Sequence, residues 1–193
     1  MSPQDQPVNQ FEVLDDQGHK TGQILGREEV HEQQLWHEVA NVWIVNNSGE
    51  VLLQLRGPHV DVNPNLWDAA VGTHVRPGED PTVAAQRCLQ TELGLTITPE
   101  QLRHLFNIQS ANPMADGVFH KVLGHVFLLK RDIDLADCTV DSNKITQLAW
   151  RPLMQVMAEV GGSDTADKYL PRAGTYYPQL FEALESEAGI MGL

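Results

Sequence analysis

Apolar and polar residues alternate along much of the chain, which is the pattern of strands with one buried face. The run FEVLDDQGHKTGQI alternates on both sides of residues 15–18, where a turn predicts a hairpin. Two apolar runs in VANVWIVNNSGEVLLQL flank the turn at residues 46–49 and predict a second hairpin. Further strands are expected at residues 66–75, 102–109, 118–129 and 145–150.

A central helix is predicted over residues 81–93. Asp80 is suited to the N-cap, Pro81 to the first helical position and Gly94 to the position after the C-terminus. Pro152 is expected to begin a short helix, and residues 176–187 are expected to form a final one. This order of elements predicts an α/β (α+β) sandwich around a mixed sheet, with residues 10–193 in a single domain after a disordered tail at 1–9.

Composition indicates the compartment in which the protein is expected and whether it would bind a membrane. No stretch approaches the ~20 apolar residues of a membrane span, and the polar start MSPQDQPVNQ is unlike a secretory signal. Cys88 and Cys138 are interpreted as free thiols, because two cysteines in a chain of 193 residues do not make a disulfide framework. We therefore expect a cytoplasmic protein with no membrane partner.

The formal net charge of −13 argues against nucleic acid as a partner, because the average field repels phosphates. The same charge repels a small anionic ligand. A diphosphate would need a divalent cation or a local group of arginine and lysine residues to bind here.

The central helix places a carboxylate on its apolar side. At 100° per residue, Glu92 projects among the apolar positions, about 20° from Ala85. It also lies in the last turn, where the helix dipole disfavours negative charge. Two interpretations follow: the last turn frays and Glu92 reaches solvent, or Glu92 is buried and binds a cation such as Mg²⁺.

Around this helix, the run GTHVRPGEDPTVAAQRCLQTELGL resembles a Nudix box, a loop–helix–loop that binds a metal-complexed diphosphate. The residues that match the family's spacing are Glu79, Arg87, Leu89, Glu92, Gly94 and Leu95. The resemblance implies the Nudix fold, an α/β/α sandwich with a mixed central sheet. It also implies that Glu92 binds Mg²⁺ or Mn²⁺ and that Glu79 pairs with Arg87 to hold the loop.

The box departs from the family pattern at three positions. Thr73 stands at the first glycine, with Gly72 one place early, while Cys88 and Thr91 replace two glutamates of the helix. Two of the three helix carboxylates that bind metal in typical Nudix hydrolases are therefore absent. Glu92 alone supports binding of a metal–diphosphate more firmly than its cleavage.

Over residues 11–98 the sequence is also similar to type I isopentenyl-diphosphate isomerases, which have the Nudix fold. That resemblance implies a second metal site made of His31, His37 and His74, with His120 at the position of a family glutamate. Each histidine alone is more simply interpreted as a polar residue with a hydrogen-bond partner. Together, they would suit Zn²⁺, or another borderline metal such as Mn²⁺, better than Mg²⁺.

The resemblance also identifies what isomerase chemistry would lack. The family's acid/base cysteine corresponds to Gly72 and its second catalytic glutamate to Val122. Isomerisation of a carbon–carbon double bond needs two positioned acid/base groups, and glycine and valine provide neither.

Three functions stay open at this point. The first is a Nudix hydrolase for a diphosphate-containing small molecule, such as a nucleoside diphosphate derivative. The others are an isomerase-like enzyme and a non-catalytic diphosphate-binding module. For the first, we expect Glu92, Glu79 and Arg87 in the catalytic machinery, Arg56, Arg76 and Gly72 against the substrate, and Glu38 as a candidate general base. The oligomeric state is open between monomer and homodimer.

Overall fold

A mixed sheet forms the centre of the fold in the computed structural model, which describes residues 9–60, 63–113, 119–172 and 174–188. Its strand order is β5-β4-β3-β8-β7, with β6 paired to β3 and β9 paired to β4. The seven strands are β3 (His37–Val45), β4 (Glu50–Arg56), β5 (Trp67–Ala69), β6 (Val71–His74), β7 (Leu102–Pro113), β8 (Phe119–Lys130) and β9 (Ile145–Pro152).

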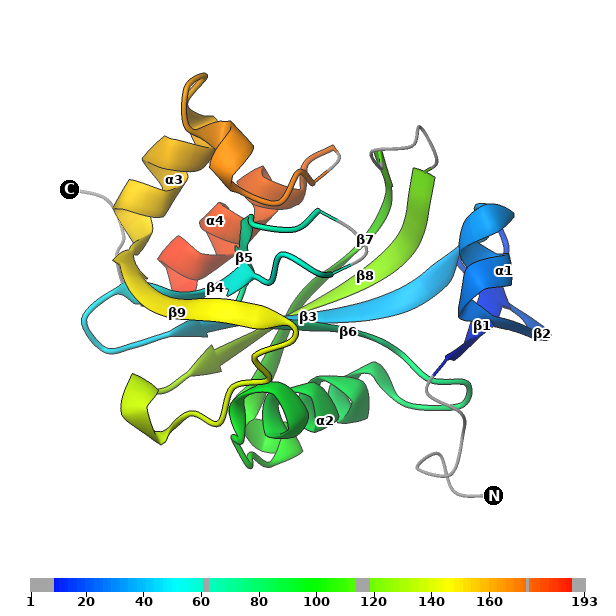
Figure 1. The fold of residues 1–193 in the computed structure, drawn as a ribbon, viewed down its shortest axis with the longest axis horizontal. Coiled ribbons are helices and arrows are strands. Elements are labelled where there is room, and N and C mark those ends of the chain that lie inside the picture. The colour runs from blue at the N-terminus through cyan, green and yellow to red at the C-terminus, as the bar shows by residue number, and fades with distance from the viewer. Residues whose placement is uncertain (1–8, 61–62, 114–118, 173, 189–193) are drawn as a thin grey trace.

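Helices cover both faces of this sheet. Helix α2 (Pro81–Leu93) lies on one face, and α3 (Leu153–Gly161) and α4 (Tyr176–Ala188) lie on the other (Figure 1). Strands β3 and β8 are parallel, whereas the other pairs are antiparallel. The predicted α/β/α sandwich with a mixed central sheet is therefore confirmed. Within the described residues, no helix is long and apolar enough to cross a membrane.

Alternation along β3 divides the core into two layers. Ala40, Val42 and Ile44 pack with the buried residues of α2. Trp43 and Val45 pack with α3 and α4 on the opposite face. Because successive side chains on a strand point to opposite faces, a polar residue in β3 is directed to one layer by its position alone.

A separate hairpin precedes the sheet. It consists of β1 (Gln10–Leu14) and β2 (Lys20–Gly26), followed by the short helix α1 (Arg27–Glu32), and lies beyond one end of β3 (Figure 1). Phe11, Val13 and Val30 form its small apolar core. The two predicted hairpins and the three longer helices are present, but α1 was not expected from its polar sequence.

The expected strand over residues 66–75 is wrong in one respect. The chain forms β5 against β4 and then β6 against β3, with Ala70 between them, because it changes strand partner at that point. The ends of α2 match the prediction: Asp80 Oδ1 accepts a hydrogen bond from Thr82 N at 2.8 Å, and Gly94 has a φ of 71°. The predicted disordered tail at 1–9 falls, except for residue 9, outside the described residues.

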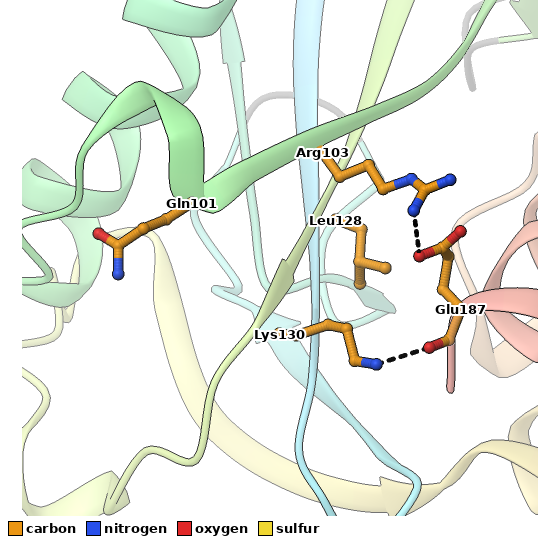
Figure 2. A pocket seen from close by; sticks show the side chains of 5 residues that line it. All are labelled: Gln101, Arg103, Leu128, Lys130 and Glu187. Carbon is orange, nitrogen blue, oxygen red and sulfur yellow. Dashed lines mark hydrogen bonds and ion pairs between the residues drawn. The ribbon is translucent and has the colours of Figure 1, made fainter. Parts of the chain in front are cut away.

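The end of α4 is fixed to the sheet beside a hollow of about 280 Å³ (Figure 2). Arg103 Nη1 lies 2.7 Å from Glu187 Oε2, and Lys130 Nζ donates to the Glu187 carbonyl at 2.6 Å. Gln101 and Leu128 complete the lining. These contacts explain how α4 docks, and the lining offers no cluster of metal ligands.

Candidate active site and metal centre

The loop before α2 is held by one buried ion pair. Arg87 Nε and Nη2 each lie 2.8 Å from an oxygen of Glu79, in the two-bond geometry that guanidinium and carboxylate groups favour. Arg87 also donates to the His74 carbonyl at 3.1 Å, and Glu79 accepts from Arg76 N at 2.9 Å. Glu79 and Arg87 therefore connect α2 to strand β6 and fix the path of the loop.

Glu92 is buried and paired with a residue that sequence reasoning did not consider. Its side chain is 8% exposed, which excludes the frayed, solvated alternative, and its Oε1 lies 2.8 Å from Lys144 Nζ. Burial opposes the charged form of Lys144, but the hydrogen bond and charge of Glu92 outweigh it and raise the pKa of the lysine. Lys144 thus places a positive charge where the box carboxylate faces the cavity.

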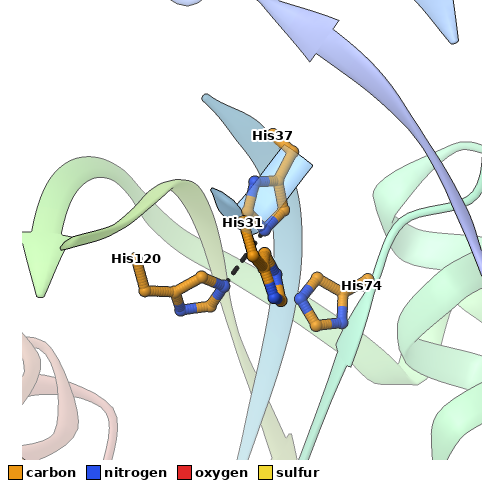
Figure 3. Close-up of side chains that lie close together, drawn as sticks. All are labelled: His31, His37, His74 and His120. Carbon is orange, nitrogen blue, oxygen red and sulfur yellow. Dashed lines mark hydrogen bonds between the residues drawn. The ribbon is translucent and has the colours of Figure 1, made fainter. Parts of the chain in front are cut away.

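Four histidines from four different elements meet at one end of the sheet (Figure 3). In the strand register, His37 of β3 lies opposite Val122 of β8, and His74 of β6 lies opposite Val39. His120, two residues before Val122, therefore points to the same face. His31 comes from α1. One possible ligand atom from each ring lies within 4.8 Å of all the others.

We call the four rings the histidine cluster, and burial keeps three of them, His37, His74 and His120, in the neutral form. Burial lowers the pKa of His37 to about 4, and burial with the nearby His37 and His31 lowers the pKa of His120 to about 3. Burial, with the nearby His37 and His120, also lowers the pKa of His74 well below its usual value. Because these imidazoles are neutral near pH 7, their nitrogen lone pairs are available to a cation.

Individual contacts direct those lone pairs inward. His37 Nδ1 lies 3.0 Å from the Leu35 carbonyl, and a proton there leaves the Nε2 lone pair facing His120 Nε2 at 3.1 Å. His74 Nε2 is buried with no hydrogen-bond partner. Phe11 stacks on His74 with ring centroids 4.3 Å apart and on His37 at 5.0 Å. Contacts outside the cluster therefore orient His37 and His74, and His74 Nε2 has no hydrogen-bond partner among the described residues.

A cavity of about 500 Å³ joins the histidine cluster to Glu92. Its lining includes Gly72, which lies opposite Asn41 in the sheet, and no cysteine. Six of the chain's 13 lysine and arginine residues line it, namely Arg27, Arg56, Arg76, Arg87, Lys144 and Arg172. Asp68 and Glu92 are the carboxylates among the described lining residues. In a chain with a net charge of −13, the lining of this cavity thus carries more basic than acidic side chains.

Asp68 organises the arginines at one side of the cavity. Its Oδ2 lies 3.3 Å from Arg56 Nη1, and its Oδ1 lies 2.6 Å from Arg172 Nη2. Neither Asp68 nor Arg172 was identified in the sequence, because they lie 104 residues apart and match no motif. Arg56 and Arg76, which were expected to contact phosphate, do line the cavity.

The structure does not support Glu38 as the candidate general base. Its neighbour His37 points into the histidine cluster, so Glu38 points to the opposite face of β3. There it lies 2.9 Å from His125 Nε2 and 3.5 Å from Lys20 Nζ. Since Glu38 is not among the residues that line the cavity, it is wrong as a general base.

A family model decides the identity of this fold. The model for the NUDIX domain matches residues 35–173, which include the loop fixed by Glu79 and Arg87, helix α2 and all seven strands of the sheet. The chain belongs to the Nudix family.

Relatives of this Nudix chain include proteins of two kinds. It is 28% identical over 185 residues to Nudix hydrolase 3 of Arabidopsis thaliana, covering 93% of this chain and 24% of that protein. It is also 28% identical over 123 residues to an isopentenyl-diphosphate Delta-isomerase of Pectobacterium atrosepticum, covering 63% and 65%. The chain therefore spans only part of these relatives.

A crystal structure from Deinococcus radiodurans has the same fold. It superposes with a TM-score of 0.65 at 19% identity and covers 92% of this chain and 98% of that chain. The similarity to isomerases that the sequence indicated is confirmed by the relatives.

Proposed function

We propose that this Nudix chain hydrolyses a diphosphate-containing small molecule, such as a nucleoside diphosphate derivative, with the help of a divalent metal. The observation that carries the proposal is the charge of the cavity, where six basic side chains and two carboxylates meet in an acidic protein. Guanidinium and ammonium groups favour phosphate oxygens, and a cavity of about 500 Å³ suits a small molecule.

Glu92 and the carbonyl of Gly72 would hold Mg²⁺ or Mn²⁺ beside the diphosphate. The donor set fits a cation that arrives with its substrate: one buried carboxylate is present, and Mg²⁺ commonly takes its remaining ligands from phosphates and water. When bound, this cation would neutralise phosphate charge and polarise phosphorus.

His31, His37, His74 and His120 would hold a second, borderline cation such as Zn²⁺ or Mn²⁺. The fit rests on the neutral rings of His37, His74 and His120, the orphaned Nε2 of His74 and the close approach of the four ligand atoms. Imidazole nitrogen suits Zn²⁺ better than it suits Mg²⁺. When bound, the ion would add a Lewis acid to the same cavity.

The remaining groups of the site would bind phosphate oxygens or hold the loop in position. Arg56, Arg76 and Lys144 would contact phosphate oxygens, and the ammonium of Lys144 already faces Glu92. Glu79 and Arg87 would act as positioning residues, because they hold the loop and the His74 carbonyl rather than face the reacting atoms. Glycine at position 72 and valine at 122 supply no acid/base group, so isomerisation is not favoured.

The test is an assay of phosphate and nucleotide release from a panel of nucleoside diphosphate derivatives with Mg²⁺ or Mn²⁺. We expect turnover that Glu92→Gln reduces by at least about a hundredfold, as loss of a metal carboxylate does. Glu182→Gln, at an exposed position of α4, is the matched control and should keep full activity. Turnover that Glu92→Gln leaves unchanged would contradict the proposal.

Two further readouts separate the alternatives. Deuterium exchange from solvent into isopentenyl diphosphate would identify an isomerase, and we expect none. Metal-dependent thermal stabilisation by a diphosphate, without turnover of any member of the panel, would identify a binding module instead.

A further inference from the structure

Arg172 is held rigidly at the wall of the cavity. It precedes α4, its side chain is 9% exposed, and its Nη2 donates to Asp68 Oδ1 at 2.6 Å and to Asn41 Oδ1 at 3.3 Å. Its guanidinium carbon lies 4.8 Å from the ring centroid of Tyr176. The Tyr176 hydroxyl in turn accepts a hydrogen bond from Trp43 Nε1 at 3.0 Å, so the ring beneath the arginine is fixed as well.

Two buried donors beside this contact have no acceptor. Within the part of the chain that the structure describes, Arg172 Nε and Asn41 Nδ2 have no hydrogen-bond partner, and both residues line the cavity. The Asn41 oxygen accepts from Arg172, which fixes the amide so that its NH₂ group is the part left over. A buried donor left unpaired is costly, so this pair is suited to an acceptor that comes with a ligand.

Glycine at position 72 leaves room for the oxygen of the Asn41 amide, while the amide nitrogen lies toward Gly124, where a Cβ would be 3.8 Å away. Gly72 lies opposite Asn41 in the pairing of β6 with β3, and a Cβ at Gly72 would lie 3.1 Å from Asn41 Oδ1. That separation is tighter than ordinary van der Waals contact, so a larger side chain would crowd the amide. The lack of a side chain at position 72 therefore lets Asn41 Oδ1 accept from Arg172 without crowding.

The charge at this place favours an anionic acceptor. The two oxygens of Asp68 are each paired with an arginine, Oδ1 with Arg172 and Oδ2 with Arg56. The carboxylate is thus engaged, and no acceptor among the described residues pairs with Arg172 Nε. A hydrocarbon chain such as that of isopentenyl diphosphate has no acceptor to offer the two donors. A carboxylate or a phosphate has several acceptor oxygens to offer them.

We propose that Arg172 and Asn41 form a specificity subsite for a second anionic group of the substrate, separate from its diphosphate. The inference rests on the proposed function, since it assumes that the diphosphate binds in the same cavity near Glu92. The substrate class that follows is a polar diphosphate whose far end carries a carboxylate or a phosphate.

The experiment uses non-hydrolysable probes, so binding is measured without turnover. Butyl methylenediphosphonate is compared with the same chain ending in a carboxylate and the same chain ending in a phosphonate, by calorimetry with Mg²⁺ present. We expect the intact chain to bind at least one of the charged probes about tenfold more tightly than the butyl probe, the effect of one charge-assisted hydrogen bond. The better charged probe identifies the acceptor.

Asn41→Asp is the decisive variant. It keeps the oxygen that accepts from Arg172 and replaces the unpaired donor by a second carboxylate oxygen, so the preference for a charged end should disappear, in addition to any loss that the change in charge causes equally for all three probes. Arg172→Gln should have the same effect. The melting temperature of this variant shows whether loss of the ion pair with Asp68 has destabilised the fold. Arg131→Gln, at an exposed position outside the cavity, should retain the preference.

The outcomes separate this inference from the proposed function. Equal affinity of the intact chain for charged and uncharged probes would overturn the subsite and leave diphosphate binding intact. A variant that weakens the butyl probe as much as the charged probes would also overturn it, because Arg172 and Asn41 would then contact the diphosphate itself. Failure of all three probes to bind would instead contradict the proposed function.

Discussion

The two ends of the cavity differ in what they offer to a ligand. The histidine cluster presents three rings held neutral by burial, and His74 Nε2 has no partner among the described residues. The end formed by Arg172, Asp68 and Arg56, which we call the arginine end, presents N–H donors fixed by a shared carboxylate. Lone pairs attract a cation and N–H groups attract an anion. One cavity therefore contains groups that attract a cation and groups that attract an anion, which is the combination that a metal–diphosphate ligand requires.

The largest effect is expected from the ion pair between Glu79 and Arg87, which fixes the loop before α2. Arg87→Ala leaves Glu79, whose side chain is 3% exposed, as a buried carboxylate without its guanidinium. We expect the free energy of unfolding, measured in urea titrations, to fall by about 3 kcal/mol. The desolvation penalty of the Glu79 carboxylate is then no longer offset by its partner. Arg103→Ala, which breaks a pair at an arginine that is 67% exposed, is the matched control and should cost far less. A loss of activity with unchanged stability would show that Arg87 acts on substrate instead.

Next in size is a change confined to the histidine cluster. His74→Ala removes a nitrogen that has no other partner, and we expect Zn²⁺ affinity to fall by about a hundredfold in competition with a chromophoric chelator. Pyrophosphate affinity without metal should be unchanged, since the arginine end is intact. His59→Ala, at an exposed residue of the same cavity lining, provides the comparison. Equal losses in both variants would refute a dedicated cluster.

Lys144 allows a test with effects of opposite sign. Lys144→Met removes the ammonium 2.8 Å from Glu92 Oε1. We expect pyrophosphate affinity without metal to fall by about tenfold and Mn²⁺ affinity to rise, because the ammonium and the metal compete for one carboxylate. Lys168→Met, which changes an exposed lysine outside the cavity, should alter neither value. A fall in both affinities would mean that Lys144 supports Glu92 rather than competes with the metal.

The smallest effect is expected at the ring that covers the histidine cluster. Phe11→Leu keeps apolar volume but loses the stacking on His74 and His37. Because such ring pairs contribute about 1 kcal/mol, we expect Zn²⁺ affinity to weaken by a few-fold. Calorimetry on the variant and the original chain measures the difference. Unchanged affinity would show that the strands alone orient the rings.

Much of the fold could be predicted because its signals are local. Asp80, Pro81 and Gly94 marked the ends of α2 through capping chemistry that acts within a few residues. The burial of Glu92 followed from helical periodicity combined with the spacing of the box. The short helix α1 was missed because most of its side chains are polar and only Val30 is buried.

The rest of the site depended on contacts between distant segments. Lys144 lies 52 residues from Glu92, and Arg172 lies 131 residues from Asn41. Neither pair leaves a periodic or spaced pattern in the sequence. The histidine cluster was predicted only through the resemblance to isomerases, because its geometry depends on the register of β3, β6 and β8.

The most direct test of the two-ended cavity is a crystal structure of the chain with Zn²⁺ and methylenediphosphonate. The account predicts an anomalous zinc peak enclosed by His31, His37, His74 and His120, with the diphosphonate oxygens against the basic residues beside Glu92. Zinc bound away from the four histidines, or a diphosphonate bound outside the cavity, would contradict it.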